Sequence, residues 1–195
     1  MIIKCWTGDD VYFPGESLVG ADLRMLNLHR ADLVGRDLSQ SNLAGADMRN
    51  AEVATAVLDC ANLSGIRAMN ARFDGVSGKD AWFVGSVISY GHFSDANLSR
   101  ANFNDSVLDG VAFERANLSG ARMTWSSYNE PNLKDASFDG QTVWPEGFDP
   151  TLYGAKRVDV NDILGVRRCE NADHGCPRSD EATRGRRRGA LGAGG

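Results

Sequence analysis

Residues 96–120 read ANLSR ANFND SVLDG VAFER ANLSG, which is five consecutive units of five residues with the same order of residue types. Each unit carries a large apolar residue in the middle and closes on a polar residue or glycine, and four of the five begin with Ala or Ser. The pattern continues in both directions. Counting in fives from Leu18 to Val143, without a change of register, meets 26 positions, and every one except Gly78 is apolar. A chain that is 42% apolar would give about 11 such positions by chance.

A period of five fits neither of the common secondary structures, because one face of a helix recurs every 3.6 residues and one face of a strand every two. The pattern instead predicts that the first and third residues of each unit point inward, with opposite bulk, and that the other three point outward. A short extended stretch followed by a tight turn would do this. Asn, Asp, Ser and Gly, which fill the outward positions, are the residues that tolerate such turns.

The units ADLVG at 31–35, ANLSG at 61–65 and 116–120, and ANLSR at 96–100 resemble those of pentapeptide-repeat proteins. The resemblance implies an all-β fold, a right-handed quadrilateral β-helix (a pentapeptide-repeat solenoid), with a short irregular C-terminal tail. Four pentapeptides would make one square coil, so that residues 20 apart stack. About 26 units would then give about six and a half coils, in a rod about 30 Å long at the usual strand spacing.

Stacking by twenty predicts four inward columns, which begin at Leu18, Leu23, Leu28 and Leu33. The last of these columns contains Phe73, Phe93 and Phe113, which we expect to form an aromatic ladder. The columns from Leu23 and Leu33 also end in large residues, Val143 and Leu133.

Two inward positions, Ala68 and Gly78, are small and lie close together in the predicted stack. We therefore expect local irregularity around residues 66–80. Bulkier residues at the usually small inward position, Ile66 and Val76, would fill the gap.

The segments outside the repeat are expected to cap the rod. Pro145 and Pro150 stop further ladder pairing, while Trp144 and Phe148 can cover the last coil. The basic end of the chain, rich in Arg and Gly, has the composition of a disordered segment. The predicted organisation is an N-terminal cap at 1–15, the pentapeptide-repeat β-helix at 16–145, a C-terminal cap at 146–166 and a disordered basic tail at 167–195.

Charge is distributed unevenly along the 195 residues, whose net charge is −5. Residues 1–150 hold 12 Lys and Arg against 20 Asp and Glu, whereas residues 151–195 hold 9 against 6. No run of 18 apolar residues would span a membrane, and no leader segment is evident at the N-terminus. The four cysteines are scattered and do not suggest a disulfide framework. A cytoplasmic protein is expected.

Folding the acidic residues onto the four faces places many of them on two neighbouring faces. A row of carboxylates about 5 Å apart would resemble a DNA duplex backbone in size and sign. The alternative interpretation is a surface that keeps a β protein soluble and monomeric. The candidate partner-binding residues are Asp32, Glu52, Asp74, Asp95, Glu114 and Asp135 on the face of the Phe ladder, and Asp37, Asp59 and Asp80 on the face that begins at Leu18.

Signals for chemistry are weak. Cys169, His174 and Cys176 match no common zinc signature, and neither a catalytic set nor a phosphate-binding loop is evident. The chain is expected not to be an enzyme and to need neither metal nor cofactor. Trp82 and Trp125, predicted on one wall, offer a second way to anchor a partner.

The resemblance implies two functions of different kinds. Some pentapeptide-repeat proteins mimic double-stranded DNA, bind DNA gyrase or topoisomerase IV, and inhibit the enzyme or protect it from antibiotics. Such a protein would not itself bind DNA through its acidic rod, nor a membrane. It could form a homodimer, since those relatives commonly dimerise. The alternative is a structural or regulatory protein-interaction scaffold with a partner unrelated to DNA.

Overall fold

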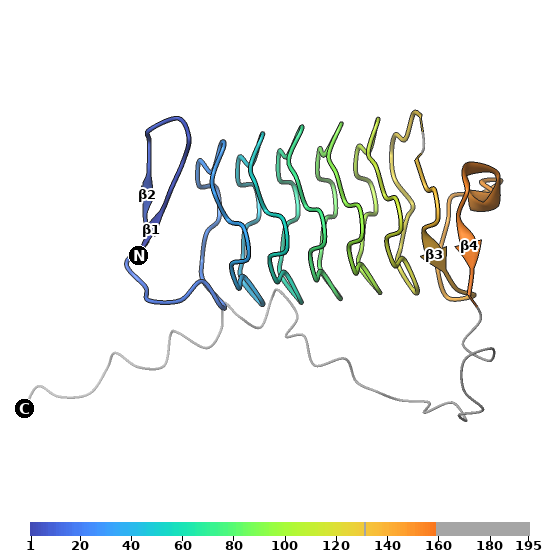
Figure 1. Ribbon diagram of the computed structural model, residues 1–195, viewed down its shortest axis with the longest axis horizontal. Coiled ribbons are helices and arrows are strands. Elements are labelled where there is room, and N and C mark those ends of the chain that lie inside the picture. The colour runs from blue at the N-terminus through green and yellow to red at the C-terminus, as the bar shows by residue number, and fades with distance from the viewer. Residues whose placement is uncertain (131, 159–195) are drawn as a thin grey trace, which may run out of the picture.

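The computed structural model describes residues 1–130 and 132–158, and within them a regular stack of coils lies between two irregular ends (Figure 1). Residues 159–195 lie outside this description, so the predicted basic tail and the end of the predicted C-terminal cap are not placed. The only helical segment of the described part is a short 3-10 turn, η1 (Pro150–Tyr153). No helix in residues 1–130 and 132–158 is long and apolar enough to cross a membrane.

Parallel backbone bridges join residues 20 apart, and four such bridges occur in each coil. The series runs from Asp22 paired with Asn42 to Asn117 paired with Ser137 without a gap. The predicted coil length is therefore confirmed, and the chain forms a β-helix in which each residue lies above its counterpart one coil earlier.

The corner turns explain the polar residues of the repeat. The fifth residue of nearly every unit has a positive φ, as at Gly65 with 66°, a conformation that glycine adopts at no steric cost. Asn or Asp at the second position accepts a hydrogen bond from the N–H two residues later, as Ser64 donates to Asn62 Oδ1 at 3.0 Å. Many Asp and Asn side chains thus stabilise the turn of their own unit.

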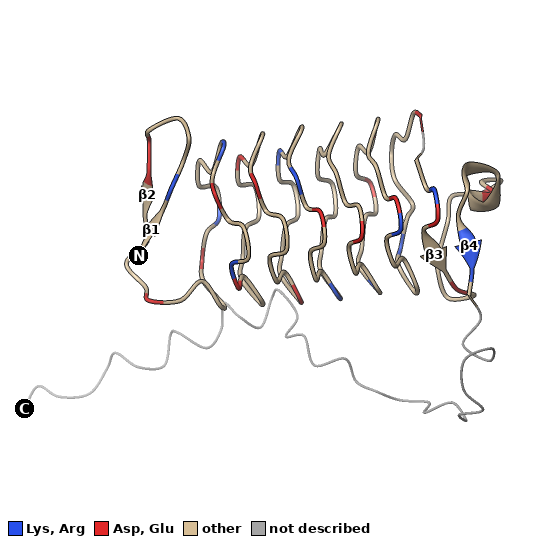
Figure 2. Ribbon diagram, in the orientation of Figure 1, with Lys and Arg blue, Asp and Glu red and all other residues tan. Residues whose placement is uncertain are grey.

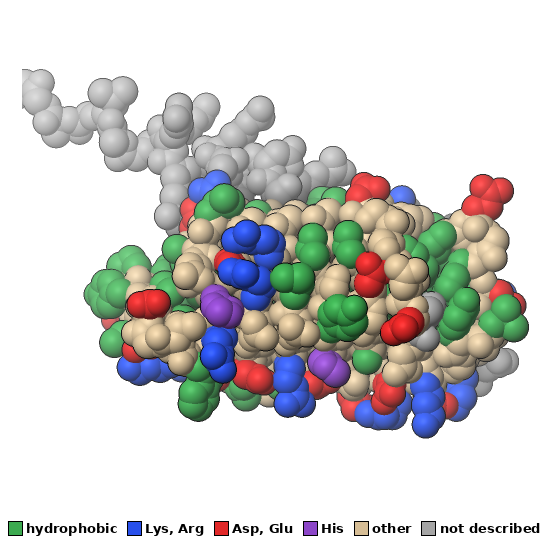
Figure 3. Space-filling model, turned by 90° about the horizontal axis from the view of Figure 1, so that it is seen from above, with side chains coloured by type: hydrophobic (Ala, Val, Ile, Leu, Met, Phe, Trp, Pro, Cys, Tyr) green, Lys and Arg blue, Asp and Glu red, His purple; other side chains and the backbone are tan. Residues whose placement is uncertain are grey.

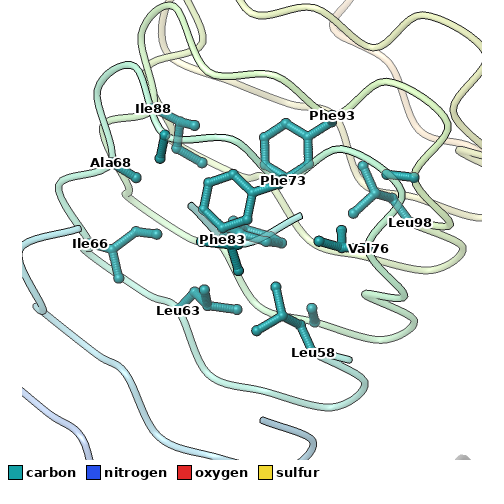
Figure 4. Packing of buried hydrophobic residues seen from close by; sticks show 14 of the residues in the cluster. Leu58, Leu63, Ile66, Ala68, Phe73, Val76, Phe83, Ile88, Phe93 and Leu98 are labelled. Carbon is teal, nitrogen blue, oxygen red and sulfur yellow. The ribbon is translucent and has the colours of Figure 1, made fainter. Parts of the chain in front are cut away.

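Two columns of phenylalanine fill the middle of the rod (Figure 4). Phe93 stacks on Phe73 and on Phe113, with ring centroids 4.7 and 5.3 Å apart, so the predicted ladder is confirmed. A second ladder comes from the opposite side, where Phe83 stacks on Phe103 at 4.7 Å. Rings of the two ladders meet edge to face, at 5.6 Å between Phe83 and Phe93, which is the favoured contact of aromatic quadrupoles.

The coils around Ala68 and Gly78 are regular, so the expected irregularity of residues 66–80 was wrong. Ile66 and Val76 lie fully inside, at 0% and 1% exposure, and restore the volume that the two small residues leave (Figure 4). Little empty space is left beside Gly78, because a Cβ added to it would lie 3.1 Å from Leu98 Cδ2. Large and small residues have exchanged positions within the unit while the backbone ladder continues.

The register of twenty is first interrupted before the last coil closes. Arg122 pairs with Val143, 21 residues later, where twenty would be expected. The extra residue is accommodated in a turn in which Asp139 Oδ1 accepts hydrogen bonds from the N–H groups of Gln141 and Thr142. As a result Val143 points outward, with 42% exposure, and Trp144 packs against the core in its place. The prediction that Val143 is inward was therefore wrong.

Both ends of the ladder are covered within the described residues. At the N-terminus, β1 (Ile2–Ile3) pairs antiparallel with β2 (Val11–Tyr12), and Asp32 N donates to Lys4 O across the edge of the first coil. At the C-terminus, β3 (Ser137–Phe138) pairs in parallel with β4 (Lys156–Arg157), so η1 and β4 add one more rung. Covered edges do not recruit further strands. The exact boundaries of the caps stay a prediction.

A largely buried carboxylate ties two coils together on the outside of the rod. Asp47, whose side chain is 11% exposed, lies 2.7 Å from Arg49 Nη2 and 3.0 Å from Arg67 Nη2, on the following coil. The hydrogen bond from Arg49 is the largest cause that lowers the pKa of Asp47, and burial opposes it.

Asp47→Asn is expected to lower the free energy of unfolding by about 1–2 kcal/mol at pH 7, because the charged hydrogen bonds are lost. A lowered folded-state pKa stabilises the fold above the unfolded value, near pH 4, and this contribution disappears as the pH falls through the folded value. The difference between variant and parent should therefore shrink below pH 4. Denaturant unfolding at pH 7 and pH 3 measures it, and an equal difference at both values would contradict the ionic role.

Candidate protein-interaction surface

The nine acidic residues predicted to bind a partner lie on two adjacent faces, but they do not form one continuous row. We name a face by a buried residue of its inward column: the Phe93 face carries six of them and the Leu98 face three. On the Phe93 face only Asp32 and Glu52 are neighbours in the bridge ladder, and the next residues in that row are Arg72 and His92. The other acids occupy the positions after the inward residue. Acidic and basic residues are interspersed along the rod (Figure 2).

Acids at the corners are held by cations one coil later. Asp95 accepts two hydrogen bonds from Arg115, at 2.6 and 2.7 Å, and Asp80 accepts two from Arg100, at 2.8 and 2.6 Å. The Arg115 hydrogen bond lowers the pKa of Asp95 and, in turn, raises that of Arg115. Asp135 is likewise paired, with Lys156 of β4, and its pKa is lowered by that hydrogen bond. These three acids connect coils to one another.

Three further acids are engaged on their own face. Asp74 lies 3.2 Å from Arg72 Nε. Glu114 accepts a hydrogen bond from the Asn132 amide at 2.8 Å and lies 3.5 Å from Arg115 Nη1. For Asp59 the donors are the hydroxyl of Ser77, at 2.7 Å, and the N–H of Lys79, at 3.0 Å.

The remaining three acids, Asp32, Asp37 and Glu52, form no ion pair within the part of the chain that the structure describes. We call them the unpaired acid patch. Asp32 and Asp37 lie in consecutive units of one coil, and Glu52 follows Asp32 one coil later. Hydrogen bonding to Ser39 lowers the pKa of Asp37, which keeps this exposed carboxyl ionised over a wider pH range. The negative charge that is free to act on a partner is thus concentrated near the N-terminal end of the two faces.

Sequence reasoning also placed Trp82 and Trp125 on one wall as anchors, and the structure separates their roles. Trp125 belongs to the C-terminal cap, where its ring lies 4.6 Å from Tyr128 and 5.0 Å from Phe148, edge to face. The hypothesis therefore fails for Trp125. Trp82 is 41% exposed and, with Arg100 and Arg122, lines a shallow hollow of about 540 Å³.

Within residues 1–130 and 132–158 no group of three or more His, Cys, Asp or Glu side chains is placed to hold a metal ion. Cys169, His174 and Cys176 lie outside the described residues, and the prediction made for them stays a prediction.

A stack of twenty-residue coils with outward polar side chains and capped ends defines the class of repeat β-helices. Eight copies of the family pattern described as pentapeptide repeats match residues 37–75 and 92–127. The chain is a member of the pentapeptide-repeat family. No curated protein matches it over its sequence.

Several solved structures resemble the chain. One is a pentapeptide repeat protein from the thylakoid lumen of Arabidopsis thaliana, at 24% identity over 63% of this chain and 72% of that chain, with a TM-score of 0.39. Another, from Nostoc PCC 7120, is 25% identical over 63% and 84%, with a TM-score of 0.35. QnrB1, a plasmid-mediated fluoroquinolone resistance protein, is 17% identical over 73% and 91%, with a TM-score of 0.34. At TM-scores below 0.5, none of these likenesses bears on what this chain binds.

Proposed function

We propose that this protein is a non-enzymatic DNA mimic that binds a type II topoisomerase, DNA gyrase or topoisomerase IV, in the cytoplasm. It inhibits the enzyme or protects it from drugs that trap the cleaved complex. The observation that carries the proposal is the unpaired acid patch, Asp32, Asp37 and Glu52, in a segment, residues 1–150, with 20 acidic against 12 basic residues. A right-handed coil, which the family resemblance implies, is part of the same proposal.

The physical basis is electrostatic. A duplex presents about one negative charge per 1.7 Å of its length, and the groove that receives it is lined by Lys and Arg. In the patch, Asp32 and Glu52 lie about one coil, or 4.8 Å, apart, and Asp37 adds a third carboxylate on the neighbouring face. The patch therefore matches a short part of a duplex, and the acids paired with cations add a weaker surrounding field. Association through such charges should be fast at low salt and should weaken steeply toward physiological salt.

Neutralising the patch should weaken binding to gyrase by roughly tenfold or more, because three charges that face the partner are removed. The variant combines Asp32→Asn, Asp37→Asn and Glu52→Gln. It keeps the side-chain oxygens that accept turn hydrogen bonds, so the fold should be unchanged. Binding to immobilised gyrase, and inhibition of supercoiling with and without a fluoroquinolone, measure the effect.

A matched control removes the same number of charges elsewhere. Asp9→Asn, Asp105→Asn and Glu146→Gln lie off the patch, and none of these acids forms an ion pair in the described part of the chain. Their combination should leave binding within about twofold of the parent. Equal losses in both triple variants would show that net charge, and not the patch, is recognised.

The second candidate function is a protein-interaction scaffold with a partner unrelated to DNA. It is favoured by the ion pairs of Asp74, Asp80, Asp95 and Asp135. In these pairs the carboxylates bind neighbouring cations of the rod itself. If the parent protein at micromolar concentration neither inhibits gyrase nor protects it, the topoisomerase proposal is wrong and this candidate remains.

A further inference from the structure

A third face of the rod has a different character from the two acidic ones. We call it the Ile88 face, and it includes the corner that follows Ile88 and its stacked counterparts. Toward the N-terminal end it carries Arg side chains, in the middle it is apolar, and toward the C-terminal end it is acidic (Figure 3). The residues are Arg30, Arg49 and Arg67, then Met69, Val87, Tyr90 and Val107, then Asp109 and Glu130.

These side chains lie in rows whose members are 20 residues apart. In the outermost corner row, Arg30 begins the series and Glu130 ends it, with Tyr90 between them. In the adjacent row, Arg49 lies one coil from the N-terminal end and Asp109 one coil from the C-terminal end. In the central row the bridges connect Asp47, Arg67, Val87 and Val107 in order. Only the corner row changes from polar or basic residues to Tyr90, Gly110 and Glu130 between the third and fourth coils. In the adjacent row Met69 is already apolar in the third coil, and in the central row Asp47 is acidic in the second.

The charged residues at the two ends of the outer rows are complementary to each other. A two-fold axis in the plane of the face, perpendicular to the rod and between the third and fourth coils, would relate two antiparallel copies. Each row would then lie opposite the same row of the second copy, in reverse order. This axis places Arg30 opposite Glu130 of the second copy and Arg49 opposite Asp109 of the second copy. Both pairs recur by symmetry, as in any isologous interface. We propose that two copies of this chain associate antiparallel through their Ile88 faces.

The charges that this pairing needs are available. Arg30 and Glu130 are exposed, and neither side chain makes a hydrogen bond or ion pair in the described residues. Arg49 and Arg67 share the single carboxylate of Asp47, which leaves one positive charge in excess. Asp109 is held in place by Ser127, at 2.6 Å, and by Asn129, at 2.9 Å.

The centre of the face is flat enough to be covered. A Cβ on Gly110 would lie 2.6 Å from Tyr90 Cδ1, so the Tyr90 ring rests along the backbone of the next coil and does not project from the rod. Its 60% exposure and the 38% exposure of Met69 leave apolar area for a second copy to bury. Six coils span roughly 25 Å, so the contact is smaller than a standard stable interface and the dimer should be weak and salt-dependent.

Reciprocal charge reversal tests the proposal. Arg30→Glu puts two acids opposite each other in both symmetric contacts, and Glu130→Arg puts two cations there. Each variant alone should dimerise at least roughly tenfold more weakly than the parent, whereas an equimolar mixture should recover association, because every reversed contact is then oppositely charged. Both sites have similar positive φ, 57° and 55°, so the exchanged residues meet the same backbone conformation.

Sedimentation equilibrium of the full chain, at roughly 10–500 μM and at low and high salt, is the measurement. Arg122→Glu, a reversal on another face, is the control and should leave the dimer unchanged. Tyr90→Asn, which keeps a residue that tolerates positive φ, should weaken it. A parent that stays monomeric at low salt, a mixture of reversed chains that does not recover association, or a loss with Arg122→Glu equal to that with Arg30→Glu would each overturn the proposal.

Discussion

Phe93→Ala is expected to lower the free energy of unfolding by about 3–5 kcal/mol, which is the usual cost of truncating a fully buried aromatic residue. The ring is completely buried and contacts four others. It stacks on Phe73 and Phe113 within its own ladder and meets Phe83 and Phe103 edge to face. The cavity would lie at the middle of the rod, where the regular backbone above and below cannot collapse into it.

His92→Ala is the matched control, because His92 precedes Phe93 in the same unit and points outward. Its effect should stay within about 0.5 kcal/mol. Chemical denaturation of both variants under one set of conditions compares them. Equal midpoints for the two would mean that Phe93 does not support the core.

Trp144→Ala is expected to cost about 3 kcal/mol, and Val143→Ala less than about 0.5 kcal/mol. Trp144 contacts Trp125, Phe138 and Phe148, with ring centroids 5.6–6.0 Å apart, and closes the C-terminal end of the core. Val143, although it continues the five-residue count, is partly exposed.

The ratio of these two effects is the informative quantity. If Val143→Ala destabilised the protein more than Trp144→Ala, the last coil would be in the uninterrupted register and the extra residue before Val143 would have to be absorbed elsewhere. Thermal melting and denaturant unfolding should agree on the order, because both report loss of the capped ladder.

The family resemblance implied the coil length, and stacking by twenty then predicted the inward columns and the Phe73–Phe93–Phe113 ladder. These follow from backbone geometry that every unit repeats. The register change at Val143 could not be predicted by counting, since the residue after it is also apolar and the turn that absorbs the extra residue depends on Asp139 and Thr142. Likewise, the sequence places the bulky Ile66 and Val76 near the small Ala68 and Gly78, but counting residues does not show that they fill the volume without distorting the coils.

The ion pairs of the surface were harder to predict, because the acidic residues were assigned to faces without their basic neighbours on adjacent coils. A signal was present in the numbering: Asp80 and Arg100, like Asp95 and Arg115, are 20 residues apart, and the stacking rule places such pairs in contact. Applied to every outward position, the rule would also have placed Arg72 one coil after Glu52, whereas the structure pairs Arg72 with Asp74. The role of Trp125 carried no such signal, because it depends on how the chain folds back after Pro145.

Within the regular coils, the direction in which an outward side chain points around the rod axis depends only on its residue number modulo twenty. Deleting a whole coil would shorten the rod and duplicating one would lengthen it, and in both cases every later side chain would keep its direction. Losing a single five-residue unit would still bury every apolar residue, yet it would rotate all later side chains by a quarter turn and bring acids beneath former neighbours of another face. Variation in length is therefore compatible with the fold in steps of five, but with a given binding surface only in steps of twenty.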